Sequence, residues 1–264
     1  HIEMAPLSWS EIIPQPELSV ATLWTDKNIK AADLLAAARP RGDLAKIHDF
    51  WFRGGYPEPW LRADPRFHEL WMEEYIRTYL SRDLGQLFPG LDKHKFFLFW
   101  RLIAGLSGTI INYAEVGRAL GVSQPTARDY FEIANATFLW RQLPSYEKKV
   151  LKRIVKHPKG YLRDSGLLHY LQRIPDLEGL RGHPQMGNSW EGLVIEEIVR
   201  QLKIRGIATD CCYYRTSAGA EVDLVLEGNF GLVAVEIKYA QSVTSRDLRS
   251  LVDFVREHKA KWGL

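Results

Sequence analysis

Two neighbouring segments near the C-terminal end of the chain alternate between apolar and polar residues. The apolar members are Val222, Leu224 and Leu226 within residues 221–227, and Val233, Val235 and Ile237 within residues 232–238. A period of two is typical of a strand with one buried face. The residues between the segments, Gly228-Asn-Phe-Gly231, can form a tight turn. The pattern therefore predicts a β-hairpin with an apolar face against the core.

The opposite face of the predicted hairpin carries charged side chains, among them Glu221. Side chains two residues apart on a strand share a face, so Glu236 and Lys238 point the same way. A two-residue turn at 229–230 sets Asp223 directly opposite Glu236. We therefore expect two carboxylates and an ammonium to converge on the polar side of the hairpin.

This trio has the composition of a metal site that acts on phosphodiesters. Two carboxylates on neighbouring strands can hold Mg²⁺, which keeps several waters and takes further oxygens from a substrate phosphate. The ion lowers the pKa of a bound water and neutralises charge on the phosphodiester. Lys238 can orient that water or stabilise the developing anion. The competing interpretation is a solvated strand face whose charges merely alternate.

A helical apolar stripe precedes the hairpin. It predicts a helix over 189–204 with Ser189 as its N-cap. The stripe consists of Val194, Ile195, Ile198, Val199 and Leu202. Glu191 falls inside it, where an acid is costly unless it is paired or bound to a metal. Glu196 lies toward the opposite side, so we expect it to be solvated. Glu191 is the better candidate for a third metal-site carboxylate.

The middle of the chain has the pattern of a winged helix. A long amphipathic helix is expected from about Pro65 to Gln86, and another over 93–106. A short helix then ends at a C-cap glycine, Gly121, and Ser123 caps the helix that follows. A strand over 138–143 and a basic segment, which we define as Lys148–Arg163, complete the module. The segment holds seven basic residues and no acid.

Two roles for this winged helix remain open. A DNA reader would present Gln124, Thr126 and Arg128 to a groove. Asp129 and Glu132 lie on the same helix and would repel phosphates, which favours a structural or protein-docking role. The basic segment can in either case contact a nucleic-acid backbone without regard to sequence. The candidate nucleic-acid contacts are Lys148, Lys149, Lys152, Arg153, Lys156, Lys159 and Arg128.

Composition narrows the setting. No apolar run approaches the roughly 20 residues that cross a bilayer, and the first residues do not resemble a signal peptide, so no membrane partner is expected. The adjacent Cys211 and Cys212 have neither a disulfide framework nor zinc-site spacing, which suits a cytoplasmic protein. The net charge is only +3. Because the basic segment alone exceeds it, the rest of the chain is net acidic, and a phosphate-bearing partner would meet the basic segment.

Separated motifs occur in the same order in one family. They are Pro6-Leu-Ser, Gly54-Gly-Tyr-Pro-Glu58, Tyr79-Leu-Ser-Arg-Asp-Leu84, Lys156-His-Pro-Lys-Gly-Tyr161, Asp164-Ser-Gly-Leu167, Trp190-Glu-Gly192, Tyr214-Arg215 and Glu221-Val-Asp223. On these motifs the chain resembles the prokaryotic AAA-type ATP-binding proteins whose C-terminal half is a domain of unknown function. Its last part resembles the PD-(D/E)XK nucleases, with Asp223 as the Asp and Glu236-Ile-Lys238 as the (D/E)XK. Val222 stands where those proteins usually have proline.

The resemblance implies an α+β multidomain fold. Residues 1–45 would be the tail of an ATPase domain and a linker, and 46–92 a helical lid-like region. Residues 93–163 would form the winged helix-turn-helix. Residues 164–264 would form a restriction-endonuclease-like mixed sheet flanked by helices. In the family pattern the helix glutamate corresponds to Glu191, the residue that the apolar stripe also singles out.

The resemblance also implies cofactors and partners. Mg²⁺ or Mn²⁺ would bind Asp223, Glu236 and Glu191, with Lys238 as the further catalytic residue. The sequence has no Gly-x-x-x-x-Gly-Lys-Ser/Thr loop, so ATP is expected only in a longer protein, of whose ATPase part residues 1–11 would be the tail. Self-association would then run through that ATPase part, and no small-molecule ligand is expected.

Two functions are therefore open. The first is a metal-dependent nuclease module regulated by an ATPase. The second is a non-catalytic interaction module in which the nuclease fold serves as a scaffold for nucleic acid or for the ATPase.

Overall fold

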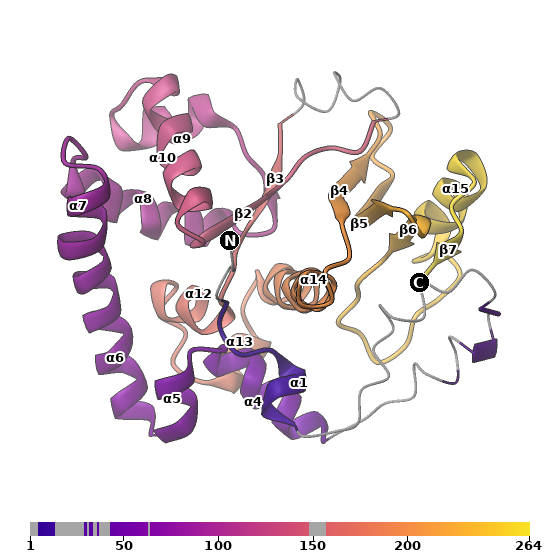
Figure 1. Cartoon of the computed structure of the whole chain (residues 1–264), viewed down its shortest axis with the longest axis horizontal. Helices are drawn as coiled ribbons and strands as arrows, with labels where there is room; N and C mark the ends of the chain where they lie inside the picture. The colour runs from indigo at the N-terminus through magenta and orange to yellow at the C-terminus, as the bar shows by residue number, and fades with distance from the viewer. Residues whose placement is uncertain are drawn as a thin grey trace. The chain divides into compact units, whose positions relative to one another are not determined.

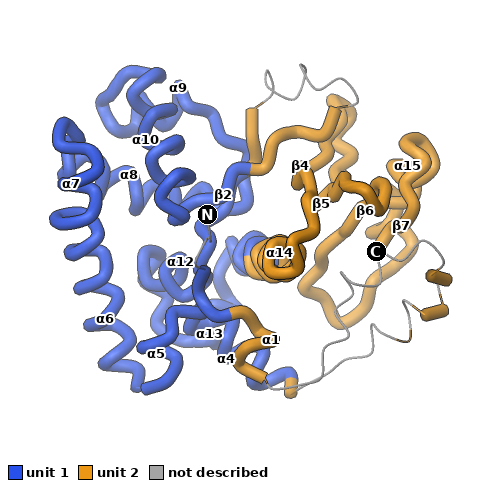
Figure 2. Tube along the Cα trace, in the orientation of Figure 1, with its two compact units in different colours: residues 1–7, 44–142, 160–192 blue, residues 8–43, 143–159, 193–264 orange. Residues whose placement is uncertain are grey.

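The computed structural model describes residues 5–13, 29–30, 32–33, 36, 43–62, 64–147 and 157–264. Helices and short strands alternate along these residues (Figure 1), which confirms the α+β class. The chain forms two compact units (Figure 2). The first contains residues 1–7, 44–142 and 160–192, and the second residues 8–43, 143–159 and 193–264. Each unit is discontinuous in sequence, whereas the predicted domains are continuous.

The first unit is mainly helical. Its helices are α4 (Leu44–Arg53), α5 (Pro57–Arg62), α6 (Pro65–Thr78), the π-helical turn η1 (Tyr79–Asp83), α7 (Leu84–Leu87), α8 (Lys93–Leu106), α9 (Tyr113–Leu120), α10 (Gln124–Ala136), α12 (Ser165–Leu171) and α13 (Leu177–Arg181). The segments from α6 to α7 form the long helical run that was expected over 65–86. Aromatic side chains fill the core of this unit. Phe99 packs edge-to-face against Phe131, and the Tyr79 ring packs at a tilt against Trp100.

The predicted helix-turn-helix is present with its predicted caps at Gly121 and Ser123, and Asn112 adds a cap that was not predicted. The Asn112 side chain accepts hydrogen bonds from the backbone at the start of α9, and Gly121 ends that helix in the left-handed region at φ +63°. Ser123 Oγ accepts the amide of Thr126 at 3.2 Å. A small sheet with the order β1-β3-β2 accompanies these helices, formed by β1 (Thr109–Ile110), β2 (Trp140–Leu143) and β3 (Lys159–Leu162). The winged helix stays a prediction, because most of its predicted wing, Lys148–Arg163, lies outside the described residues.

The strand predicted over 138–143 begins two residues late, at Trp140. Phe138 has a left-handed backbone, with φ +61°, and the amide of Leu139 donates to the Ala134 carbonyl. Both features belong to the C-terminal end of α10 rather than to a strand. The alternation of apolar and polar side chains does not show at which residue the preceding helix ends.

One buried carboxylate joins two of the sequence motifs. Asp164 Oδ2 accepts the amide of Gly55 at 2.9 Å, and Oδ1 accepts the amide of Leu167 at 2.8 Å, which caps α12. A Cβ on Gly54, whose φ is +76°, would lie 2.4 Å from Asp164 Oδ1. Both oxygens of Asp164 are thus used by the backbone, so these motifs have a structural explanation.

A second buried polar cluster corrects the start of the helix expected at Ser189. Helix α14 (Met186–Ile204) begins three residues earlier. Ser189 is an interior residue whose Oγ accepts from Trp51 Nε1 at 3.0 Å and lies 2.6 Å from His169 Nε2. His169 Nδ1 lies 2.9 Å from the Phe52 carbonyl, which can only accept, so Nδ1 carries the proton. Ser189 then donates to Nε2, so its hydroxyl links the Trp51 and His169 side chains and does not cap the helix.

The second unit is built on a sheet with the order β4-β5-β6-β7. Its elements are α1 (Trp9–Ile12), the C-terminal part of α14, β4 (Thr209–Arg215), β5 (Glu221–Gly228), β6 (Gly231–Val235), α15 (Arg249–His258) and β7 (Trp262–Gly263). Strands β4, β5 and β6 are antiparallel, and β7 pairs with β6 in parallel. Cys211 and Cys212 of β4 are not joined in a disulfide. No described helix is long and apolar enough to cross a membrane.

The expected division of the hairpin into an apolar and a polar face is only partly right. Val222, Leu224 and Leu226 are fully buried, as predicted. Val225 and Ala234, on the opposite face, are buried as well and pack with Leu251 and Phe254 of α15. The charged side chains therefore stand at the end of a face that is otherwise covered by a helix.

The His169 cluster predicts a pH dependence of stability. Burial lowers the pKa of His169 from 6.5 to about 4. Between these pH values the unfolded chain binds a proton that the folded unit does not bind, so stability is lost as the pH falls from about 6.5 to about 4. The full effect is about 3 kcal/mol. Urea denaturation of the parent and of His169→Gln, followed by tryptophan fluorescence at several pH values, should show a smaller loss in the variant.

The matched control is His94→Gln, because His94 is exposed on α8. This variant should keep the acid sensitivity of the parent. Equal losses of stability in the parent and His169→Gln over this pH range would contradict the assignment of a neutral, buried His169.

Candidate functional site

The β5–β6 hairpin has the predicted register. Gly228 pairs with Gly231 across the two-residue turn at 229–230, and the pairing continues to Leu224 opposite Val235. The next positions in the same register are Asp223 and Glu236. The predicted register is therefore confirmed as far as Leu224 and Val235, and the two acids follow directly at its end, close enough for the charge of Asp223 to act on Glu236.

Strand β6 nevertheless ends at Val235, three residues before the predicted end at Lys238. The amide of Ile237 donates to Asp223 Oδ2 at 2.7 Å, and the amide of Glu236 donates to the Leu264 carbonyl at 2.9 Å. The Ile237 amide thus donates to a side-chain oxygen instead of a carbonyl of β5, and the regular strand pairing stops. The alternation of apolar and polar residues does not predict this change of hydrogen-bond partner.

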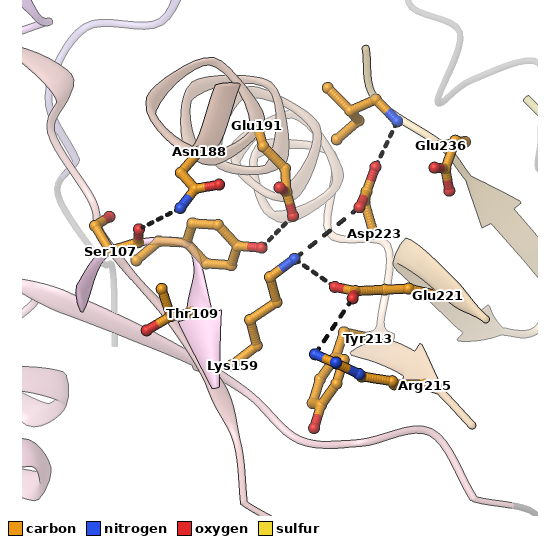
Figure 3. A network of polar contacts seen from close by, with 12 residues as sticks. Ser107, Thr109, Lys159, Asn188, Glu191, Tyr213, Arg215, Glu221, Asp223 and Glu236 are labelled. Atoms are coloured by element: carbon orange, nitrogen blue, oxygen red, sulfur yellow. Dashed lines mark hydrogen bonds and ion pairs between the residues drawn. The ribbon is translucent and has the colours of Figure 1, made fainter. Parts of the chain in front are cut away.

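The two facing acids are buried. The side chain of Asp223 is 8% exposed and that of Glu236 7% exposed. Lys238 is exposed, and its Nζ donates to Glu236 Oε1. Glu236 Oε2 is buried and has no hydrogen-bond partner among the described residues. Figure 3 shows Asp223 and Glu236 beside each other, with the Ile237 amide bonded to Asp223.

Burial shifts the titration of both acids in the same direction. It raises the pKa of Asp223, although the hydrogen bond from Ile237 and the charges of Lys159 and Lys238 oppose the shift. Burial also raises the pKa of Glu236, with a further increase from the negative charge of Asp223. Negative charge on this pair is therefore costly, and a cation placed beside it would be stabilising.

Lys159 enters this site, although the sequence pattern placed it with the nucleic-acid contacts. Its side chain is 6% exposed, and Nζ lies 2.7 Å from Glu221 Oε1 and 4.0 Å from Asp223 Oδ1 (Figure 3). The ammonium is thus committed to the carboxylates of Glu221 and Asp223 rather than displayed on a basic surface. An indication of this was present in the sequence. The predicted site holds three acids, Glu221, Asp223 and Glu236, and only one lysine, so a further cation is needed to balance their charge.

Arg215 is the other residue that the pattern did not assign to the site. Its Nη1 lies 3.6 Å from Glu221 Oε2. The network in the second unit then contains the carboxylates of Glu221, Asp223 and Glu236 and the cations Lys159, Arg215 and Lys238. When all are ionised, the named charges balance.

The predictions for Glu191 and Glu196 of α14 have different outcomes. Glu191 is buried, as its place in the apolar stripe requires, and accepts a hydrogen bond from the Tyr161 hydroxyl within the first unit. Its role as a third carboxylate of the site stays a prediction. The expectation for Glu196 is wrong, because this residue is 1% exposed. Arg200 Nε lies 3.8 Å from Glu196 Oε2, so a cation one turn along the helix permits the burial.

The residues of the hairpin suit a small ion with few protein ligands. Within the described part of the chain, no three His, Cys, Asp or Glu side chains are grouped so that they could hold a metal ion. Mg²⁺ needs only one or two carboxylates when water and phosphate complete its coordination. The unpartnered Glu236 Oε2, next to Asp223, is an oxygen of the required kind, so Asp223 and Glu236 fit such an ion.

Only some of the predicted nucleic-acid contacts belong to the described residues. Lys148, Lys149, Lys152, Arg153 and Lys156 lie outside the described residues. Arg128 is exposed on α10, where a groove or a phosphate could reach it. Asp129 beside it is exposed as well, so the two roles considered for this helix both remain.

Two protein families match parts of this chain. Residues 44–178 match the family described as "Domain of unknown function (DUF8612)", which is more than half of the chain. The chain belongs to this family. Residues 186–263 of the DUF8612 chain, which include the hairpin, match a second family, "Domain of unknown function (DUF4143)". The first match ends within α13, and the second begins at the first residue of α14.

Two curated relatives are uncharacterized mycobacterial proteins. They are "Uncharacterized protein Mb2031c" of Mycobacterium bovis and "Uncharacterized protein Rv2008c" of Mycobacterium tuberculosis. Each is 36% identical to the DUF8612 chain over 205 residues, which is 77% of this chain and 46% of the relative. The chain thus spans about half the length of these relatives. No solved structure matches it.

The backbone contact of Asp223 gives a direct test of the geometry. Asp223→Ala removes the acceptor for the Ile237 amide, and a hydrogen bond to a charged group contributes about 1.5–3 kcal/mol. Hydrogen exchange measured by NMR should therefore show the Ile237 amide exchanging roughly 10- to 100-fold faster. Asp223→Asn keeps an oxygen acceptor and should show a smaller change. If neither variant alters the exchange rate of Ile237, the described end of β6 is incorrect.

Proposed function

We propose that the second unit carries a Mg²⁺- or Mn²⁺-dependent site that cleaves phosphodiesters. Support comes from the facing pair Asp223 and Glu236, with Lys238 on the second acid. The observation that carries the proposal is Glu236 Oε2, which is buried without a partner in the described residues and stands beside a second buried acid. An acid in that setting is stabilised by a cation.

Each residue of the hairpin then has a role. A bound divalent ion would supply a water of lowered pKa and would neutralise charge on the phosphodiester. Asp223 and Glu236 would hold the ion, and Asp223 is kept in place by the Ile237 amide. Lys238 would orient the attacking water and stabilise negative charge on the phosphate. Glu191 is proposed as a further carboxylate that holds the ion or orients one of its waters.

The proposal extends to nucleic acid as the substrate class. The basic residues Lys148, Lys149, Lys152, Arg153 and Lys156 would contact the phosphate backbone, together with Arg128 of α10. The resemblance to PD-(D/E)XK nucleases and to AAA-type ATP-binding proteins points the same way, because both act beside phosphate groups. ATP binding is proposed only for a longer protein that contains a phosphate-binding loop.

A non-catalytic scaffold is the second candidate, and the charge balance of the network favours it. Lys159 and Arg215, added to Lys238, compensate the three carboxylates of the site without a metal ion. In this case the nuclease-like hairpin would be retained for its fold, and the chain would bind nucleic acid or the ATPase without cleaving a substrate.

Thermal denaturation with Mn²⁺ distinguishes the two candidates. At a concentration about 100 times the Kd, binding should stabilise the second unit by about 2.7 kcal/mol and raise the Tm by several degrees. Asp223→Asn and Glu236→Gln should each abolish the shift. The control Asp253→Asn, which changes an exposed acid of α15, should keep it. The scaffold function is favoured if Mn²⁺ leaves the Tm of the parent unchanged.

Cleavage of a labelled oligonucleotide tests the chemical step. Lys238→Ala should still bind Mn²⁺ and should lose roughly 10²- to 10³-fold in rate, as expected when one stabilising group of a transition state is removed. A Lys238→Ala variant that cleaves as fast as the parent would remove Lys238 from the mechanism.

Salt-dependent binding tests the basic segment. Replacement of Lys148, Lys149, Lys152 and Arg153 with alanine should weaken binding to duplexes of different sequence about equally. The slope of log affinity against log salt should fall by about 0.9 for each phosphate that the protein no longer neutralises. Fluorescence anisotropy with a labelled duplex measures both quantities.

A control with the same change of charge separates a local effect of the basic segment from an effect of net charge. It replaces Lys203, Arg246, Arg249 and Arg256, which are exposed elsewhere in the second unit. Its effect should be smaller. If both quadruple variants bind the duplex equally weakly, the basic segment has no special role.

A further inference from the structure

Lys159 differs from the other cations of the hairpin network in two respects. It is buried, with a side chain 6% exposed, whereas Lys238 and Arg215 have side chains 39% and 48% exposed. It also comes from β3, far from the hairpin in sequence, while Lys238 lies two residues after Glu236. The ammonium of Lys159 is therefore a fixed charge inside the site, as Figure 3 illustrates.

The contacts of Lys159 with the two acids of β5 are unequal. The distance from Nζ to Glu221 Oε1 is 2.7 Å, which is a direct hydrogen-bonded ion pair. The distance from Nζ to Asp223 Oδ1 is 4.0 Å, too long for a hydrogen bond but close enough for strong electrostatic attraction. Glu221 thus anchors the ammonium, and Asp223 Oδ1 lies near a positive charge without being bonded to it.

This geometry has a consequence for any second cation. Asp223 Oδ2 accepts the Ile237 amide, which leaves Oδ1 as the oxygen for an ion. An ion on Asp223 Oδ1 would lie within a few ångströms of the Lys159 ammonium. Two like charges at that separation in a buried site repel strongly. The repulsion falls when a negatively charged phosphate joins the ion.

We propose that Lys159 is a built-in counter-ion of the hairpin site, which stabilises Glu221 and Asp223 without a metal and opposes divalent-ion binding until a phosphate group enters. Lys159 is a positioning residue in this account and not a metal ligand. The inference rests on the proposed function of Asp223 and Glu236. It explains why a site with buried acids has balanced charges, and it makes ion binding depend on the phosphate substrate.

Calorimetric titration of the whole chain with Mn²⁺ tests the inference. Lys159→Met removes the charge but keeps the length of the side chain, and it should bind Mn²⁺ roughly tenfold more tightly or better, because the opposing charge is gone. Lys159→Arg keeps the charge and should bind with about the affinity of the parent. Lys203→Met, a change at an exposed lysine of α14, is the matched control and should also resemble the parent.

A thermal melt establishes that each variant is folded. If Lys159→Met does not fold, Lys159→Gln replaces it, since glutamine can still donate to Glu221 while it carries no charge. A merely structural lysine would lower the Tm and leave Mn²⁺ affinity unchanged or weaker. Tighter binding in the uncharged variant is therefore the signature of a counter-ion.

The outcomes separate this inference from the proposed function. Tighter Mn²⁺ binding in the uncharged variant, but not in Lys159→Arg or Lys203→Met, supports the counter-ion. Equal or weaker binding in the uncharged variant overturns it and leaves the metal site in place. No Mn²⁺ binding by the parent and by every variant overturns the proposed metal function, and the counter-ion inference with it.

Discussion

The burial of acids at one end of the β5–β6 hairpin is the constraint on which the second unit depends. Carboxylates in a covered sheet are stable only beside cations or hydrogen-bond donors. The chain meets this requirement with Lys159 on Glu221, Lys238 on Glu236 and the Ile237 amide on Asp223. The contact of the Ile237 amide with Asp223 also marks where β6 stops. The same constraint leaves Glu236 Oε2 without a partner in the described residues, and that oxygen links the fold to a chemical function.

Two buried aspartates show how a structural carboxylate differs from a candidate ligand. Asp164 gives both oxygens to backbone amides, those of Gly55 and Leu167, and joins the loop at Gly55 to the start of α12 in the first unit. Asp223 gives one oxygen to the Ile237 amide and keeps the other beside a lysine at 4.0 Å. Both residues belong to motifs that recur in the resembled family. Only their contacts separate the residue that holds the backbone from the one that could hold an ion.

The sequence predicted what depends on local periodicity and not what depends on packing between distant segments. The hairpin register followed from alternation and from a two-residue turn, and the caps at Gly121 and Ser123 followed from the preferences of these residues. The partner of Glu221 lies 62 residues earlier in the chain, so no spacing rule could identify Lys159. Glu196 was misplaced for a similar reason, because its burial depends on how the helix packs and on the nearby Arg200.

The central claim is that Asp223 and Glu236 can hold a divalent ion in the presence of Lys159. A crystal of the whole chain soaked in Mn²⁺ together with a short phosphorothioate oligonucleotide tests it most directly through an anomalous difference map. The account predicts one peak within about 2.5 Å of Asp223 Oδ1 and Glu236 Oε2, with the Lys159 ammonium still on Glu221. A map without a peak at the hairpin, in a crystal where the oligonucleotide is bound, would contradict the account.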